Sequence, residues 1–432
     1  MDRISAFGDA DVMEIAERIL RAGPICDECL GRGFGKLGSG FTNAQRGQML
    51  RESLDHAVSD DAATKCWVCQ GAFARIGEWA AEAAQRVADV EFRTYRFGMI
   101  PSVRFEQMEA FYRERFPSSH HEGLKHAFNR ALGMAFEPLI EASVTVGFKL
   151  PDVAFEVDLR TEILHLRIES VYLFGRYRKQ MRGIPQTRWP CGACKGRGCE
   201  QCRFTGLQYA DSVEALIAGP IVAEASAEDG CLHGAGREDI DARMLGTGRP
   251  FVLEAIAPRR RTLEIERIHE RINTLAEGRI EVSPLVAVRK EAVKWVKTLR
   301  ASKRYRAWVS FAQPVEEESL QKAVASLCGP VNQQTPQRVA HRRANKIRVR
   351  HVLEMQAVLE DETHAIVEVH GDGGLYIKEL VSGDDGRTMP SLAEAMGCAA
   401  EVSALDVIDV CGGKLPDRLA TGESSRKVTR GM

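Results

Sequence analysis

Eight of the twelve cysteines in this 432-residue chain occur as CxxC pairs. The pairs are Cys26/Cys29, Cys66/Cys69, Cys191/Cys194 and Cys199/Cys202. A CxxC turn places two sulfurs on one side of a metal ion, and zinc binds four thiolates in a tetrahedron. We therefore predict two structural zinc sites, one from the first two pairs and one from the last two. Buried free thiols are the alternative for the first group, and a redox CxxC is the alternative for the second.

Two aspartates lie between two arginines in the segment GREDIDARMLG, which spans residues 236–246. Neighbouring guanidinium groups keep carboxylates ionised at neutral pH. An ionised aspartate can act as a nucleophile or stabilise a developing positive charge. The residues that could do this are Asp239, which is two positions after Arg237, and Asp241. From composition alone, a charged loop held by salt bridges explains the segment at least as well.

Three clusters of basic side chains indicate a polyanionic partner. Residues 338–350 contain six basic side chains and no acid. Residues 285–310 contain eight against one acid, Glu291, and Arg259–Arg261 forms the third cluster. The net charge of the chain is only −1, so the acids must be segregated elsewhere. Such segregation is typical of a protein that binds a nucleic-acid backbone, although any one cluster could be a solvated face.

The first of these clusters contains the side chains that we predict to bind backbone phosphates. They are Arg342, Arg343, Arg348 and Arg350. Arg348 and Arg350 alternate with apolar residues, so one strand could present them as a row.

The composition is that of an ordinary globular protein, with 44% hydrophobic and 28% charged residues. This excludes a disordered or collagen-like chain. No apolar run approaches the roughly 18 residues that a membrane helix needs. The first twenty residues carry charges throughout and lack the apolar core of a signal peptide. We therefore expect a cytoplasmic protein with no membrane partner.

Hydrophobic periodicity predicts a multidomain α+β protein. The predicted parts are a helical zinc-binding region at 1–85, a mixed module at 86–187, a four-cysteine linker at 188–206 and a large unit at 207–432. The mixed module contains two strands at 153–159 and 164–168. Strands in the large unit are predicted at 251–255, 306–311 and 365–370, and helices at about 212–227, 285–301 and 391–396. The segment 370–374, HGDGG, lacks a phosphate-loop signature, and we interpret it as a hairpin turn leading into a strand at 376–380.

Several segments resemble the archaeal and eukaryotic tRNA pseudouridine synthases of the Pus-ten family. The GRED segment extends to GREDIDARMLGTGRPF at 236–251, which is similar to that family's catalytic loop. GIPQTRWPC at 183–191, QTPQRVAHRRA at 334–344 and GGLYIKELVSGDDGRT at 373–388 resemble other family patterns, in the family's order. The resemblance implies a THUMP-like RNA-binding fold before the catalytic domain. It also implies a catalytic domain built on a mixed, mainly antiparallel sheet.

The resemblance implies a role for each candidate residue. Asp239 matches the essential catalytic aspartate, and Asp241 is the fallback in the same motif. Tyr305 matches the aromatic residue that contacts the flipped-out uracil. Ile377 and Lys378 match a hydrophobic and basic pair that packs against the catalytic aspartate. In addition, Leu405 resembles the apolar residue on the other wall of the pocket.

The expected activity is isomerisation of uridine to pseudouridine in the T-arm of tRNA, at position 54, 55 or both. This reaction has no redox or phosphate-transfer step, so we expect no organic cofactor. A monomer acting on one tRNA is the simplest expectation. Two alternatives have a different activity: a noncatalytic zinc-containing tRNA-binding protein, and a THUMP-type tRNA methyltransferase. The methyltransferase would need a glycine-rich cofactor loop, which we do not find in the sequence.

Overall fold

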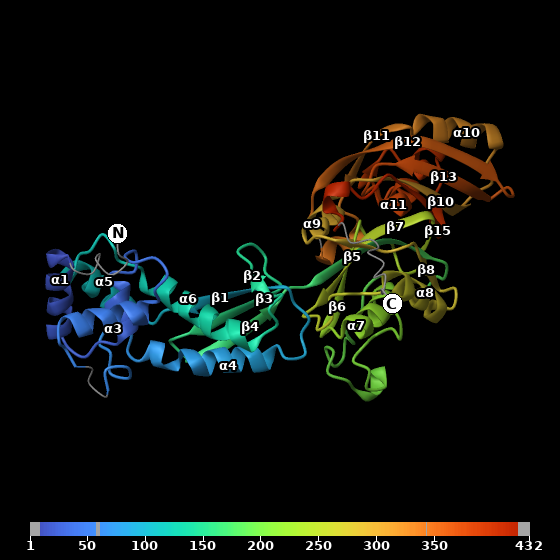
Figure 1. The fold of residues 1–432 in the computed structure, drawn as a ribbon. Helices are drawn as coiled ribbons and strands as arrows, with labels where there is room; N and C mark the ends of the chain where they lie inside the picture. Colours follow the sequence, from blue (N-terminus) through green and yellow to red (C-terminus); the bar gives the residue numbers. More distant parts are fainter. Residues whose placement is uncertain (1–8, 58–60, 343, 422–432) are drawn as a thin grey trace. The chain divides into compact units, whose positions relative to one another are not determined.

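A computed structural model describes residues 9–57, 61–342 and 344–421 of the chain. The chain divides into two compact units between Glu169 and Ser170, and we describe each unit by itself. Figure 1 labels the elements of both units. Within the described residues, no helix combines the length and the apolar character that crossing a bilayer requires.

The N-terminal unit consists of helices and a four-stranded sheet. Its helices are α1 (Ala10–Arg21), α2 (Asp27–Arg32), α3 (Asn43–Ser53), α4 (Ile76–Arg86), α5 (Val103–Arg115) and α6 (Leu124–Phe136), with short 3-10 turns η2 (Ala72–Arg75) and η3 (Glu137–Leu139). Its strands are β1 (Thr94–Ile100), β2 (Thr145–Val146), β3 (Val153–Asp158) and β4 (Ile163–Ile168), in the order β2-β1-β3-β4. The predicted strands at 153–159 and 164–168 are confirmed as the antiparallel pair β3–β4.

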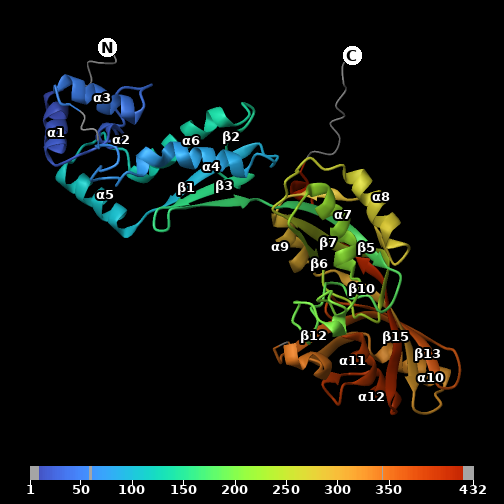
Figure 2. The same ribbon diagram turned by 90° about the horizontal axis from the view of Figure 1, so that it is seen from below.

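One hydrophobic core runs through the whole N-terminal unit. Figure 2 shows α4 and α6 lying along the sheet, and α6 contacts both α4 and β1. Buried residues of the helical region, such as Ile19 and Trp79, belong to the same cluster as Phe97 and Phe155 of the sheet. The predicted boundary at residue 85 therefore does not separate two cores: the helical region and residues 86–169 of the mixed module fold as one unit.

The C-terminal unit is built on an eleven-stranded mixed sheet. Nine strands follow the order β14-β11-β12-β13-β10-β15-β7-β5-β8, while β6 pairs with β7 and β9 pairs with β5. The strands are β5 (Val171–Lys179), β6 (Asp229–Gly234), β7 (Arg243–Ile256), β8 (Ile280–Val282), β9 (Val286–Val288), β10 (Ser302–Phe311), β11 (Gly329–Gln334), β12 (Ile347–Leu359), β13 (His364–Gly371), β14 (Thr388–Met389) and β15 (Ala400–Cys411). Among the described pairings of this C-terminal sheet only β15–β7 is parallel, which confirms the predicted mixed, mainly antiparallel sheet.

Helices and short turns cover this sheet. They are α7 (Val213–Ala225), α8 (Ile265–Ala276), α9 (Glu291–Thr298), α10 (Glu317–Ser326), α11 (Ile377–Ser382), α12 (Leu392–Met396), η4 (Glu200–Cys202), η5 (Gln337–Arg342) and η6 (Asp417–Leu419). Their buried residues and those of the strands form the main core, in which Ile217, Phe251 and Leu320 are fully enclosed. The helices predicted near 212–227 and 391–396 are confirmed as α7 and α12.

Three predictions about this unit are wrong. The boundary at residue 187 lies too far along the chain, because β5 pairs with β7, β8 and β9 of the C-terminal sheet. The segment 285–301 is not one helix: β9 comes first, and α9 begins only at Glu291. The segment 376–380 is helical rather than extended. Ile377, Leu380 and Val381 are buried on one face of α11, and this spacing suits a helix.

Candidate active site and metal sites

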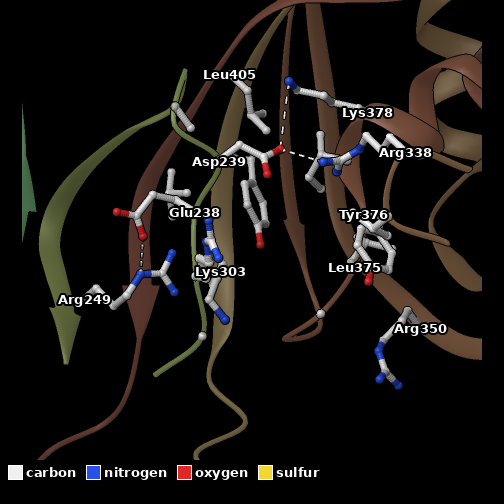
Figure 3. Close-up of a pocket in the computed structure, with 18 of the residues that line it drawn as sticks. Glu238, Asp239, Arg249, Lys303, Arg338, Arg350, Leu375, Tyr376, Lys378 and Leu405 are labelled. Atoms are coloured by element: carbon white, nitrogen blue, oxygen red, sulfur yellow. Dashed lines mark hydrogen bonds and ion pairs between the residues drawn. The ribbon is translucent and has the colours of Figure 1, made fainter. Parts of the chain in front are cut away.

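One pocket in the C-terminal unit brings together candidate residues from distant parts of the sequence (Figure 3). Its cavity has a volume of about 280 Å³. The predicted residues that line it are Asp239, Tyr305, Arg348, Arg350, Ile377, Lys378 and Leu405. They come from the loop between β6 and β7, from β10, β12 and β15, and from the first turn of α11.

Asp239 lies between two cations in this pocket. Its Oδ2 atom accepts a hydrogen bond from Arg338 at 3.0 Å, and Lys378 Nζ lies 3.9 Å away (Figure 3). The side chain of Asp239 is 33% exposed. Arg338 also donates to Glu379, at 2.6 Å, and Glu379 is buried. Burial opposes the charge of Arg338, but the two carboxylates together raise its pKa above the ordinary value. Arg338 is therefore a fixed cation beside Asp239.

Lys378 is closer to Asp241 than to Asp239. Its Nζ atom donates to Asp241 Oδ2 at 2.8 Å. Burial works against ionisation of Asp241, yet the Lys378 ammonium group holds the pKa of Asp241 below its usual value. Asp241 is 57% exposed and is absent from the pocket lining. The nearby Arg243 binds Asp406.

A buried network holds the loop that carries Asp239. Glu238 pairs with Arg249 at 2.8 Å, and the two side chains are 1% and 2% exposed. The Tyr177 hydroxyl also donates to Glu238, at 2.8 Å. Lys179 is fully buried and donates to the carbonyl oxygens of Asp239 and Ile240, at 3.3 and 3.1 Å. Glu238 therefore anchors the loop from within the core, while Asp239 faces the pocket.

Tyr305 forms part of the floor of the pocket from β10. It lies opposite Val369 of β13 and Val407 of β15, between two neighbouring strands. Burial raises the pKa of Tyr305 to about 12, and the charge of Arg249 offsets only part of this effect. Its hydroxyl therefore stays protonated at neutral pH, and its ring can contact a planar ligand. Leu405, two positions before Val407 on β15, adds an apolar wall.

Sequence reasoning missed several residues of this site. Arg338 was noted only as one of a basic run, and its contact with Asp239 joins residues 99 positions apart. Glu238 and Arg249 lie in the recognised segment, but nothing local shows that they form a buried pair. Arg342 and Arg343 cannot be placed: the side chain of Arg342 and all of Arg343 lie outside the described part of the chain.

The first group of cysteines has the geometry of a four-thiolate metal site. Cys26, Cys29, Cys66 and Cys69 are all buried, and their sulfurs lie within 4.8 Å of one another. Four sulfurs on one zinc ion at the usual bond length of about 2.3 Å would be about 3.8 Å apart. Cys26 Sγ and Cys69 Sγ are 3.7 Å apart. The two CxxC turns of the N-terminal unit therefore fit one tetrahedral ion.

The second group, in the C-terminal unit, fits a metal equally well. The Sγ distances are 3.9 Å for Cys191–Cys199, 3.9 Å for Cys194–Cys202 and 3.7 Å for Cys199–Cys202. Backbone N–H groups also donate to two of the sulfurs: Gly198 to Cys194 and Gly206 to Cys202, each at 3.2 Å. Each group can hold a metal ion in a closed, four-ligand site.

Comparison with known proteins identifies the family. A protein-family model described as "Pus10, C-terminal" matches residues 172–411. A second family model, described as "Pus10 THUMP domain, archaeal", matches residues 79–158. A relative from Halorubrum lacusprofundi is 46% identical over 94% of this chain and 98% of its own length. One from Methanothrix thermoacetophila is 42% identical over 93% and 95%. Both are named tRNA pseudouridine synthase Pus10.

The fold and these matches define an enzyme of the pseudouridine synthase class with a THUMP domain. The chain belongs to the Pus10 family. The THUMP match lies inside the N-terminal unit, where the sequence predicted such a module. A chain in a solved Cbf5–Nop10–Gar1 complex is similar over 44% of this chain and 43% of its own, at 17% identity. The TM-score of this match is 0.29.

Proposed function

We propose that this protein isomerises uridine to pseudouridine in tRNA, with Asp239 as the essential carboxylate. The observation that carries the proposal is the pocket itself, in which Asp239, Tyr305, Lys378 and Leu405 line one cavity although they are widely separated in sequence. The names of the relatives support the same substrate. We further propose the T-arm, at position 54, 55 or both, as the target, on the resemblance of the catalytic segments.

The reaction requires a charged group and a planar apolar surface. The C1′–N1 bond of uridine breaks, the uracil rotates, and a new C5–C1′ bond forms. C5 then loses its proton, and N1 gains a proton. A base inside a helix must first leave its stack, and an aromatic side chain can receive it. In our proposal the uracil lies against Tyr305 between Leu405 and Ile377, with the Asp239 carboxylate at its glycosidic bond.

The cations around Asp239 suit this role. Arg338 and Lys378 place two positive charges within 4 Å of the carboxylate that would act at the ribose or the base. Tyr305 could receive the C5 proton only after its own proton had left. Because its pKa is about 12, we propose that its ring positions the base and that its hydroxyl takes part only once substrate has changed its surroundings.

We propose zinc as the metal of both four-cysteine groups, because thiolate tetrahedra with no open position are typical of structural zinc. Zinc bound there would crosslink the chain and supply no chemistry to the reaction. Clustered thiolates are also typical of reducing compartments, which supports a cytoplasmic location. A monomer that binds one tRNA remains our expectation.

Recognition of tRNA is proposed to depend on the basic residues of the C-terminal unit. Arg348 and Arg350 line the pocket from β12, as predicted for a row on one strand. For Arg342 and Arg343, contact with RNA phosphates stays a prediction. Replacing this pair with alanine should flatten the dependence of binding on salt by roughly one to two units, because each lost phosphate contact releases about one fewer counterion.

The decisive experiment is incubation of the protein with an unmodified tRNA transcript and no added cofactor. We expect pseudouridine in the T-arm, detected by mapping each modified position. Transcripts with cytidine at position 54 or at position 55 would tell which uridine is used. If the transcript binds but no position is converted, the proposed activity is wrong.

A further inference from the structure

The cations at the two ends of the pocket differ in whether they are paired with carboxylates (Figure 3). At one end Arg338 and Lys378 are paired with the carboxylates of Asp239, Asp241 and Glu379. Figure 3 shows Lys303 and Arg350 at the other end, away from these ion pairs. In the described part of the chain, neither of these two cations has a carboxylate within ion-pair distance. Neither charge is neutralised by a direct ion pair there, although Arg350 contributes, against the effect of burial, to lowering the pKa of the neighbouring Asp372.

Both cations have incomplete hydrogen bonding. Lys303 is 8% exposed, and its Nζ atom donates to one protein group, the carbonyl oxygen of Ala301 at 3.1 Å. Arg350 uses one nitrogen on the carbonyl of the adjacent Val349, while its buried Nε atom has no partner among the described residues. The neighbouring acid, Asp372, is bonded to His351 at 3.0 Å. Buried cationic donors without acceptors are costly unless a ligand supplies the acceptor.

A glycine turn lies between the two cations. A Cβ atom added to Gly373 would lie 3.5 Å from Lys303 Nζ, and one added to Gly374 would lie 3.4 Å from Arg350 Nε. The Gly373 position is also closed to side chains by the Ala301 carbonyl, at 2.7 Å. Gly374 has a φ of +93°, which glycine adopts without strain. The turn thus keeps side chains out of the space beside both cations.

We infer that Lys303, Arg350 and the Gly373–Gly374 turn form a binding site for the phosphodiester backbone next to the uridine that enters the pocket. This phosphate site rests on the proposed function, because it assumes RNA in the same cavity. A phosphodiester supplies the negative charge and the acceptors that the two cations lack. The tetrahedral group also needs room beside the backbone, and the missing side chain of Gly374 leaves it next to Arg350.

The phosphate site defines how the nucleotide is oriented in the pocket. Asp239, Leu405 and Ile377 form the end suited to the uracil and its glycosidic bond, while Lys303 and Arg350 hold the backbone. Burial, together with repulsion from Arg249, lowers the pKa of Lys303 to about 8 in the free protein, so the lysine is still mostly charged at neutral pH. A bound phosphate would make that charge easier to hold.

The test combines protein variants with single uncharged linkages in the RNA. Full-length tRNA is assembled from synthetic pieces so that each T-loop linkage in turn is a methylphosphonate. We expect Lys303→Met to weaken binding of ordinary tRNA about tenfold. At one linkage near the target uridine, the methylphosphonate should weaken binding to the wild-type protein but have little further effect on Lys303→Met. Such coupling means that the lysine and that phosphate contact each other.

The matched control is Lys322→Met, which removes an equally charged but exposed lysine on α10, paired only with Glu318. It should behave as the wild type at every linkage. Circular dichroism shows whether Lys303→Met folds. If it does not, the same binding experiment is done with Arg350→Met. The phosphate site is wrong if, for the folded variants, the fold-losses in affinity from the protein change and from the methylphosphonate simply multiply at every linkage. Such independence would mean that the side chain and the phosphate do not contact each other.

The activity of the wild-type protein is measured on the same RNAs and is read separately. Coupling at one linkage with no pseudouridine formed would support the phosphate site and reject the proposed function. Pseudouridine formation without coupling at any linkage would reject the phosphate site and leave the function standing.

Discussion

Asp239 and Asp241 differ by two positions in sequence, and the same lysine contacts both. Their surroundings are nevertheless unlike. Asp239 lines the pocket and is bonded to Arg338, which the buried Glu379 holds in place. Asp241 is more exposed and is the closer partner of Lys378. The structure thus separates a carboxylate that faces a ligand space from one that balances a neighbouring charge.

We therefore predict that Asp239→Asn abolishes product formation while Asp241→Asn stays active. Asparagine keeps the shape of aspartate and removes its charge, so tRNA affinity should remain nearly unchanged in both variants. The measurement is the pseudouridine yield in a single turnover, with binding measured alongside. We expect a loss of at least about 1000-fold for Asp239→Asn, in line with removal of a catalytic group. An inactive Asp241→Asn beside an active Asp239→Asn would reverse the assignment.

Lys303 should also make stability depend on pH. Its pKa is about 8 in the folded protein, whereas an unfolded lysine has a pKa of about 10.4. Between these values the unfolded chain binds more protons, so the free energy of unfolding contributed by Lys303 rises with pH. Below pH 8 the folded protein bears the full penalty of the buried charge.

Lys303→Met removes this penalty. Its stability relative to the wild type should be most favourable below pH 8 and should fall by up to roughly 3 kcal/mol as the pH approaches 10.4. Urea unfolding of both proteins at several pH values measures the difference. If the difference in stability does not change with pH, the pKa of Lys303 is not lowered in the folded protein.

At the scale of elements, periodicity predicted some of the helices and strands and left others, such as α5 and β11, unassigned. The strands β3, β4 and β13 alternate apolar residues, so local sequence was sufficient for them. It failed for α11, because a six-residue helix carries too few turns to distinguish it from a strand. Contacts such as Asp239–Arg338 could not be predicted at all, since they depend on how the sheet is assembled.

The cysteine groups could be predicted because ligand spacing is a local property, and their geometry leads to a test. We predict that the purified protein carries about two zinc ions. Cys66→Ser should lose one of them and destabilise the N-terminal unit by several kcal/mol, because binding energy at a structural site contributes to folding. Elemental analysis and thermal unfolding measure both effects. Cys328→Ser, an exposed cysteine outside both groups, is the control and should change neither.

At the scale of the whole molecule, the division at Glu169 was missed because β5 follows β4 after only two residues. A short connection usually joins neighbours in one sheet, so sequence proximity favoured the wrong unit. The burial of β5 settles its place: Leu173 and Tyr177 lie in the core of the C-terminal unit. Nothing in the local sequence pattern of β5 shows whether it joins the sheet of the N-terminal unit or that of the C-terminal unit.

The separate cores predict that residues 1–169 fold without the rest of the chain. A fragment of this length contains all of the residues in its hydrophobic cluster and one complete cysteine group. It should unfold cooperatively and bind about one zinc ion. Calorimetry and metal analysis of the isolated fragment check this, with Cys66→Ser in the same fragment as the control. A fragment that is unfolded with zinc present would show that the unit depends on its neighbour.

The position of β15 has a consequence for the order in which the enzyme is made. This strand is the last of the sheet to be synthesised, yet it lies in the middle, between β10 and β7. A nascent chain emerging from the ribosome presents β5–β9 and β10–β14 first, and in the described sheet β15 joins these two groups of strands. Leu405 and Val407 of this strand also line the pocket. A ribosome that stalls before residue 400 therefore exposes two open sheet edges and no complete pocket, so that such a chain would be aggregation-prone and inactive.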